Sequence, residues 1–319
     1  MAAVAVVPIQ TDSAVAPFLV RARDYIQKSR AASTLRGYRA DFRDFADFCN
    51  GLGVPSLPAS PETVCAYLSH CADLGLKAGS IQRRVSSIGG AHAAAGLDIP
   101  TTAVSVHLCL AGIRRELGTR QVGKTPVLTP DMAAMLAHVP AGLLGTRDRA
   151  LLLVGFAGAL RRSELVGLNV EDLEFTDDGV KVLIGRSKTD QDGEGQTVGI
   201  ARGLKLCPVG ALRSWLTAAH ISSGPVFRSV NRHGKVQPSA ITDQVVALVV
   251  KRYAAAAGLN ARQYAGHSLR AGLVTSAAIN NVPEYVIQRQ TRHKSTDMLR
   301  RYIRDASLFR DNASARVGL

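Results

Sequence analysis

The chain has 319 residues, 46% of them hydrophobic, and a formal net charge of +14 from 39 Lys and Arg against 25 Asp and Glu. This apolar content suffices for a sizeable core in each of two domains, which excludes a disordered chain as the default expectation. The positive charge favours a polyanionic partner such as nucleic acid, although a basic solvated surface would produce the same total.

Secretion and membrane insertion are disfavoured. The five cysteines are scattered and form no Cys-x-x-Cys pair, a pattern typical of reduced thiols in the cytoplasm. The first ten residues are apolar but lack the basic residues that precede the core of a signal peptide. The longest strongly apolar run, 150–160, is too short to span a bilayer. We therefore expect a cytoplasmic protein without a membrane contact.

Residues 1–118 predict a bundle of helices. Apolar residues recur at steps of three and four after a possible cap at Ser33 or Thr34. Helices are expected at about 14–29, 61–74, 79–95 and 102–117, and one after this cap carries Leu35 to Cys49. Two of them present basic side chains on one face, which suits DNA but is also ordinary for a solvated helix. The candidate DNA-binding residues are Arg36, Arg39, Arg43, Arg83 and Arg84.

A polar, glycine-containing segment that ends in proline, 119–127, is the predicted linker to a second domain at 128–319. Thr129-Pro130-Asp131 is typical of a helix start. Helices are predicted at 130–139, 146–157, 161–167, 208–220, 238–257, 268–280, 283–290 and 295–303. Strands are predicted near 170–175, 180–185 and 197–200, with the first turn at Asp177-Asp178-Gly179. The expected fold is mainly α with a small antiparallel β-sheet, an α+β fold.

The second domain contains the residue types that metal-free cleavage of a DNA phosphodiester requires. A nucleophile must attack phosphorus, fixed donors must stabilise the nonbridging oxygens, and the leaving sugar oxygen needs a proton. A phenol needs a base or a cationic setting, because its pKa is near 10, and guanidinium groups bind phosphate through a bidentate fork. Such residues follow one another along the chain: Arg161, Lys188, His267, Arg270, His293 and Tyr302.

Each of these residues has an ordinary explanation when taken alone. Tyr302 follows Met298 and Leu299 by one helical turn and could be a core aromatic. Arg162 competes with Arg161 for the same role, and lysines such as Lys188 are common in loops. Their joint order and spacing favour a site, since the His267-Ser268-Leu269-Arg270 spacing places both ends on one helix face. The other histidines fit no metal-ligand spacing and no phosphate-binding glycine loop occurs, so we expect neither metal nor cofactor.

This order of residues resembles the tyrosine recombinase (phage integrase) family over the whole chain. Leu160-Arg161-x-Ser163-Glu164 matches the family's Leu-Arg-x-x-Glu pattern. The region around His267 and the Tyr302-Ile303-Arg304-Asp305 ending are most similar to the Cre-like members. The resemblance implies a helical core-binding domain followed by a catalytic domain. It also implies site-specific recombination through a 3′-phosphotyrosine intermediate and Holliday-junction strand exchange, without metal or ATP.

The resemblance further implies a role for each site residue. Arg161 and Arg270 would clamp the scissile phosphate, and His293, where Cre-like members have tryptophan, would donate to a nonbridging oxygen. Glu164 matches an acidic position that orients the site. The residues that act on the reacting oxygens would be Lys188 as proton donor, His267 as acid or base, and Tyr302 as nucleophile.

Two further expectations come from the family. Its usual glycine before the second histidine is Arg292 here, so either the loop differs or Arg292 adds a phosphate contact. The segment 305–319, with the apolar pair Leu308-Phe309, would dock on a neighbouring protomer. The implied partners are a double-stranded DNA site with inverted-repeat arms and a homotetramer on two duplexes.

Two other functions stay open at this point. A type IB topoisomerase shares the phosphotyrosine chemistry, although the compact N-terminal bundle argues against it. A DNA-binding regulator on an inactive recombinase fold is the alternative without catalysis, and the complete set of six residues argues against that.

Overall fold

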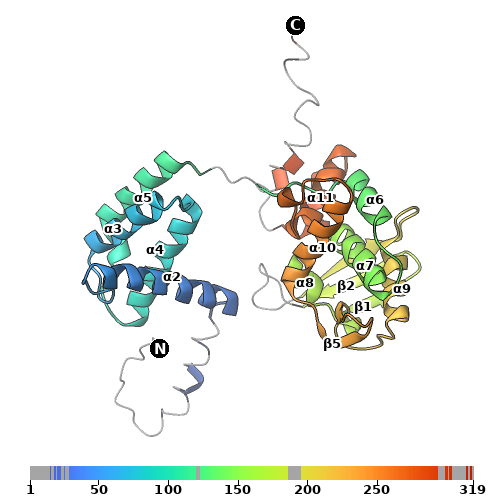
Figure 1. The fold of residues 1–319 in the computed structure, drawn as a ribbon, viewed down its shortest axis with the longest axis horizontal. Coiled ribbons are helices and arrows are strands. Elements are labelled where there is room, and N and C mark those ends of the chain that lie inside the picture. The colour runs from blue at the N-terminus through green and yellow to red at the C-terminus, as the bar shows by residue number, and fades with distance from the viewer. Residues whose placement is uncertain are drawn as a thin grey trace. The chain divides into compact units, whose positions relative to one another are not determined.

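The structure is a computed structural model that divides the chain into two compact units, Met1–Val122 and Gly123–Leu319, each described by itself (Figure 1). The boundary falls inside the segment predicted as a linker. The residues that the structure describes are 15, 18, 20–22, 25, 29–119, 123–185, 195–293, 299–300, 302–303, 314 and 317. Within this part of the chain, no helix has the length and apolar character that crossing a membrane requires.

The first unit is helical, as predicted. Its elements are α2 (Ala32–Gly51), α3 (Pro61–Asp73), α4 (Ala78–Ala94), a 3-10 turn (Pro100–Thr102) and α5 (Val104–Leu117). The buried residues Phe45, Tyr67, Ile81 and Ile88 form the centre of its core, and the Phe45 and Tyr67 rings meet edge to face. The proposed cap was wrong, because α2 already begins at Ala32 without a side-chain cap. Most of the helix predicted at 14–29 lies outside the described residues.

The second unit combines helices with two small antiparallel sheets (Figure 1). The helices are α6 (Thr129–Ala137), α7 (Leu143–Ala157), α8 (Arg162–Val166), α9 (Pro208–Ala218), α10 (Asp243–Ala256), α11 (His267–Ile279) and α12 (Glu284–Thr291). The strands of the larger sheet are β1 (Leu173–Phe175), β2 (Gly179–Ile184) and β3 (Gln196–Ala201), in the order β1-β2-β3. Its first turn, closed by the Thr176 N–H to the Gly179 carbonyl, is the predicted one.

A second hairpin was not predicted from the sequence. It consists of β4 (Arg228–Val230) and β5 (Val236–Ala240). The helix predicted to begin at 238 therefore begins at Asp243. Pro238 and Ser239 are typical of a helix start, but Pro is also tolerated in an edge strand, where its missing N–H is no loss.

The core of the second unit surrounds α7 and takes in one face of the larger sheet together with α9 and α10. Val180, Val182 and Ile184 alternate with exposed residues along β2, so that one face of the strand is buried. Residues 150–155 of α7 are all buried, which is why that helix shows no amphipathic pattern. The single tryptophan, Trp215 of α9, is fully buried and donates its indole N–H to the Val226 carbonyl at 2.7 Å. Burial of one such large side chain contributes about 2–3 kcal/mol.

The end of the predicted linker is built into the second unit. The Thr125 and Val127 N–H groups donate to the carbonyls of Gln263 and Ser268, and Val127 is fully buried. Gly272 of α11 permits this close approach, because an added Cβ would collide with the Val127 carbonyl. The segment therefore lies along the first turns of α11, the helix that carries His267 and Arg270.

Candidate active site

Five of the six predicted catalytic residues lie in the described part of the chain, and the structure brings them together. Arg161 is the N-cap of α8, while His267 and Arg270 occupy the first turn of α11. His293 follows α12 directly, and Tyr302 lies in a short helical stretch. The sixth residue, Lys188, lies outside the described residues.

A buried carboxylate holds Arg161. The Arg161 guanidinium donates from Nη1 to Glu164 Oε1 at 2.6 Å, and the Arg161 backbone N–H donates to Glu164 Oε2 at 2.9 Å. Arg292 donates to the same Oε2 through Nη2 at 2.8 Å. Burial by itself would raise the pKa of Glu164, but Arg292 and Arg161 outweigh it and hold that pKa below its usual range. Glu164 is therefore ionised and shared between two arginines.

Arg270 is 2% exposed and is oriented by backbone carbonyls. Nη1 donates to the Ala159 carbonyl at 2.6 Å, and Nη2 donates to the Thr291 carbonyl. Ala159 has a φ of 46°, a strained backbone that places its carbonyl against this guanidinium. Burial, followed by the nearby charge of Arg161, lowers the pKa of Arg270 to about 10, so the group stays cationic at neutral pH.

His293 is held by the residue two positions before it. Its Nδ1 lies 2.7 Å from Thr291 Oγ1. Burial, followed by the charges of Arg270 and Arg161, lowers the pKa of His293 to about 4. The ring is therefore neutral at pH 7. The Thr291 hydroxyl donates its proton to the Ile287 carbonyl at 2.8 Å, so it accepts from the Nδ1–H of His293, and Nε2 carries the free lone pair.

The histidine of α11 and the candidate nucleophile are in contact. His267 Nε2 lies 3.2 Å from Tyr302 Oη, across 35 positions of sequence. His267 keeps a solvent-exposed edge, yet partial burial and the charges of Arg270, Arg161 and Arg162 lower its pKa. A neutral imidazole beside a phenol can accept the phenol proton, which is the relation that a general base needs.

The charges of the site do not balance. Arg161, Arg270 and Arg292 bring three positive charges, whereas Glu164 brings one negative charge. The excess of two suits an anion such as a phosphodiester, whose nonbridging oxygens gain charge during displacement. The arrangement therefore offers a nucleophile with a base and a cationic clamp.

Replacing His293 with glutamine is expected to flatten the pH dependence of stability. The folded pKa near 4 lies below the unfolded value of about 6.5, so only the unfolded chain binds this proton between the two. The contribution of His293 is present above pH 6.5 and is lost as the pH falls toward 4. We expect the wild type to lose about 1–3 kcal/mol more than the variant between pH 7 and 4.5 in urea unfolding. Parallel curves would contradict this assignment.

Two positions were missed or left undecided by the sequence. Thr291 contacts two site residues, because its backbone carbonyl accepts from Arg270 and its hydroxyl lies beside His293 Nδ1. The only sequence signal for this role was its position directly before Arg292-His293. The sequence left Arg292 undecided between a changed loop and a phosphate contact. In the structure its side chain is 6% exposed and binds Glu164.

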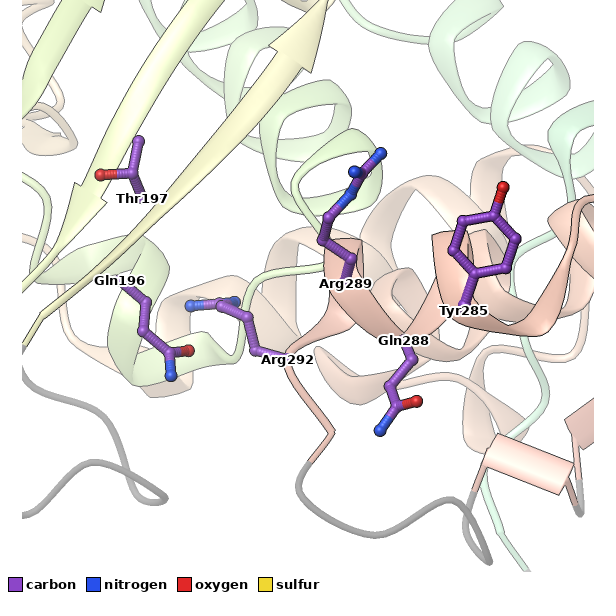
Figure 2. A pocket seen from close by; sticks show the side chains of 6 residues that line it. All are labelled: Gln196, Thr197, Tyr285, Gln288, Arg289 and Arg292. Carbon is purple, nitrogen blue, oxygen red and sulfur yellow. The ribbon is translucent and has the colours of Figure 1, made fainter.

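A groove lies beside the site, between the start of β3 and α12. Figure 2 shows the residues that line it: Gln196, Thr197, Tyr285, Gln288, Arg289 and Arg292. Gln288 donates through Nε2 to the His293 carbonyl at 3.2 Å, which connects the groove wall to the loop that carries His293. Arg292 turns away from Gln288, toward the side of the groove formed by β3 (Figure 2).

The candidate DNA-binding arginines of the first unit fall into two groups. Arg84 is 16% exposed and binds Asp44 Oδ2 and Tyr67 Oη, both at 2.9 Å, while Arg83 binds Asp41 at 2.6 Å. These contacts tie α4 to α2 and α3 and neutralise much of the charge of both arginines. The remaining candidates are exposed and form no ion pair with any described residue: Arg36, Arg39 and Arg43.

Comparisons with known proteins match the chain to one family over most of its length. The phage integrase family matches residues 126–308, and the phage integrase N-terminal SAM-like domain matches residues 23–95. An integrase/recombinase xerD homolog of Selenomonas ruminantium is 43% identical over 305 residues, which cover 93% of this chain and 89% of that protein. A likeness specific to Cre-like members stays a prediction.

Two solved structures share the fold at low sequence identity. The Tn1549 transposon integrase in complex with transposon right-end DNA has a TM-score of 0.64 at 15% identity, over 91% of this chain and 97% of that one. A lambda integrase dimer bound to a COC′ core site has a TM-score of 0.61 at 16% identity, over 91% and 77%. The expected fold, a helical domain followed by a mixed catalytic domain, is confirmed.

Proposed function

Because the chain belongs to the phage integrase family, we propose that it is a tyrosine recombinase that breaks and rejoins DNA at defined sites. The proposal rests on one observation above the others, the 3.2 Å contact between Tyr302 Oη and His267 Nε2 beside the Arg161 and Arg270 guanidiniums. Family membership supports the class of reaction, and the geometry supports the residues that would perform it.

In the proposed cleavage step, Tyr302 Oη attacks the scissile phosphorus while His267 Nε2 accepts the phenol proton. The bond from phosphorus to the 5′ oxygen breaks, and Lys188 supplies the proton that this leaving oxygen needs. A 3′-phosphotyrosine link replaces the phosphodiester, so the energy of the broken bond is retained. Attack by the 5′ hydroxyl of another strand then reverses the step, releases Tyr302 and joins the strands in a Holliday junction.

Arg161, Arg270 and His293 act on the phosphate itself. The two guanidiniums donate to its nonbridging oxygens, and His293 donates from Nε2 in the tautomer that carries the ring proton on that nitrogen. Glu164 and the backbone carbonyls of Ala159 and Thr291 hold these cations in place before DNA arrives. Fixed donors lose little freedom during the reaction, which is how such a site lowers the barrier.

The first unit supplies affinity for DNA through its exposed arginines. Replacing Arg36, Arg39 and Arg43 together with glutamine is expected to weaken DNA binding. The negative slope of log K against log salt should also become shallower by about 2–3, because each lost phosphate contact contributes about 0.9 to its magnitude. Fluorescence anisotropy at several salt concentrations measures this slope. Arg84→Gln is the control, with a lower melting temperature and an unchanged slope; equal slopes for the triple variant and the wild type would refute the assignment.

We also propose a homotetramer on two duplexes, with inverted-repeat arms in each site and 305–319 docked on a neighbouring protomer. Family membership supports this assembly, and 305–319 falls almost wholly outside the described residues. A suicide substrate tests the function itself: DNA sites selected from a random library are nicked just 3′ of the cleavage point, so that the short fragment with the free 5′ hydroxyl diffuses away and the covalent adduct accumulates. Peptide mapping should then place the DNA on Tyr302.

The same assay separates the alternatives. Adducts that form only on selected sites, with strand exchange between two of them, support a recombinase. Adducts on any sequence, with relaxation of supercoiled plasmid, would instead indicate a type IB topoisomerase. DNA binding without any adduct would indicate a non-catalytic regulator.

A further inference from the structure

Three consecutive residues at the end of α12 reach the three cationic parts of the site. The Thr291 carbonyl accepts from Arg270, the Arg292 guanidinium binds Glu164, and His293 is itself a site residue. Glu164 in turn holds Arg161. Arg292 is thus the only one of the three whose side chain connects α12 to the start of α8, among the contacts of the described residues.

We propose that Arg292 is a positioning residue for the strand cleavage proposed above, acting through Glu164 to orient Arg161 and to anchor the loop that carries His293. The inference rests on the proposed function. It assigns Arg292 neither to the phosphate nor to the nucleophile.

The backbone of Arg292 is in a conformation that glycine adopts more readily. The residue has φ 57° and ψ 41°, the left-handed conformation at a helix C-terminus that glycine adopts without strain. The family resemblance places a glycine here. An arginine accepts this conformation only where its contacts compensate, and the contact observed is the one to Glu164 Oε2 at 2.8 Å.

Burial of the Arg292 side chain is also energetically unfavourable. It is 6% exposed although it borders the open groove of Figure 2, and its Nε has no hydrogen-bond partner among the described residues. A buried donor without a partner is unfavourable. The guanidinium is nevertheless turned inward onto Glu164, which argues against the phosphate contact that the sequence left open.

The charge arithmetic shows what the contact does. With Arg161 alone, the Glu164 carboxylate would offset the charge of Arg161 completely. With Arg292 present, one carboxylate is shared by two guanidiniums, so Arg161 keeps part of its charge and some of its donors for an incoming oxyanion. Because Glu164 is fully buried, it cannot gain this second cation from solvent.

The test measures single-turnover cleavage of a suicide substrate by Arg292→Gly and Arg292→Lys. We expect Arg292→Gly to cleave about 10- to 100-fold more slowly, a loss similar to that found when a hydrogen-bonded partner of a metal ligand is removed, with DNA affinity within about threefold. Arg292→Lys should recover part of the rate, because it keeps a charge near Glu164 but loses the fork. Arg289→Ala, an exposed arginine on the same helix, is the matched control and should cleave within about twofold of the wild type.

A double-mutant cycle distinguishes positioning from a general loss of structure. If Arg292 acts through Glu164, adding Arg292→Gly to Glu164→Gln should slow cleavage by less than about threefold, because the partner is already lost. Full additivity, or an Arg292→Gly chain that cleaves like the wild type, would overturn the inference and leave the proposed function intact. A wild type that forms no adduct would overturn both.

Discussion

Replacing Tyr302 with phenylalanine is expected to abolish the covalent DNA adduct, a loss of at least about 10⁴-fold in cleavage, as for other enzymes that lose their nucleophile. The substitution removes only Oη, the atom that lies 3.2 Å from His267. The ring packs against a small cluster that includes Val274, Ile287 and Leu299 and should stay there. We therefore expect unchanged DNA affinity and stability, measured by anisotropy and thermal melting beside the adduct assay.

Tyr285→Phe is the matched control for this experiment. Tyr285 is 69% exposed on α12 and borders the groove beside the site, so its phenol is available to solvent but not in contact with His267. Its variant should form adducts at the wild-type rate. Adducts that persist in Tyr302→Phe and vanish in Tyr285→Phe would show that Tyr285, and not Tyr302, is the nucleophile.

From the sequence alone, the residues proposed for the site could be named, but not the residues that hold them in place. A histidine and an arginine three positions apart must share a face of α11, so His267 and Arg270 could be paired from the sequence. The contact between Arg292 and Glu164 spans 128 positions, and that between Arg270 and the Ala159 carbonyl spans 111. No local pattern encodes such contacts, because they depend on how α8, α11 and α12 pack.

The secondary structure likewise could be predicted where local patterns decide it, and not where packing does. Helices with a clear apolar stripe, such as α3 and α5, were predicted within two residues of their observed ends, since tertiary packing and local periodicity agree there. The β4-β5 hairpin was missed because its strands are short, and β5 contains Pro238 and alternates little. Arg84 could not be distinguished from Arg43 by sequence, as only packing brings Asp44 and Tyr67 to its guanidinium.

Replacing Arg161 with alanine is expected to slow single-turnover cleavage by about 10²–10³-fold, the usual cost of removing one fixed donor from an oxyanion site. Arg161→Lys should recover little of this, because an ammonium keeps the charge but cannot donate to Glu164 and to phosphate through one planar fork. Glu164 retains Arg292 in both variants, so its buried charge stays paired and the chain should fold. The melting temperature of each variant checks this last point.

Arg162→Ala is the sharpest control for that result, because the two arginines are adjacent and compete for the role in the sequence. The Arg162 side chain is 45% exposed and lies 3.6 Å from Asp243, a surface ion pair of about 0–1 kcal/mol. Its removal should change the cleavage rate by less than about threefold, and the small rise that it causes in the pKa of His267 should leave that ring neutral at pH 7.5. A loss in Arg162→Ala as large as in Arg161→Ala would mean that the site needs the total charge of the loop. A large loss confined to Arg161 would mean that it needs a guanidinium in the orientation that Glu164 gives it.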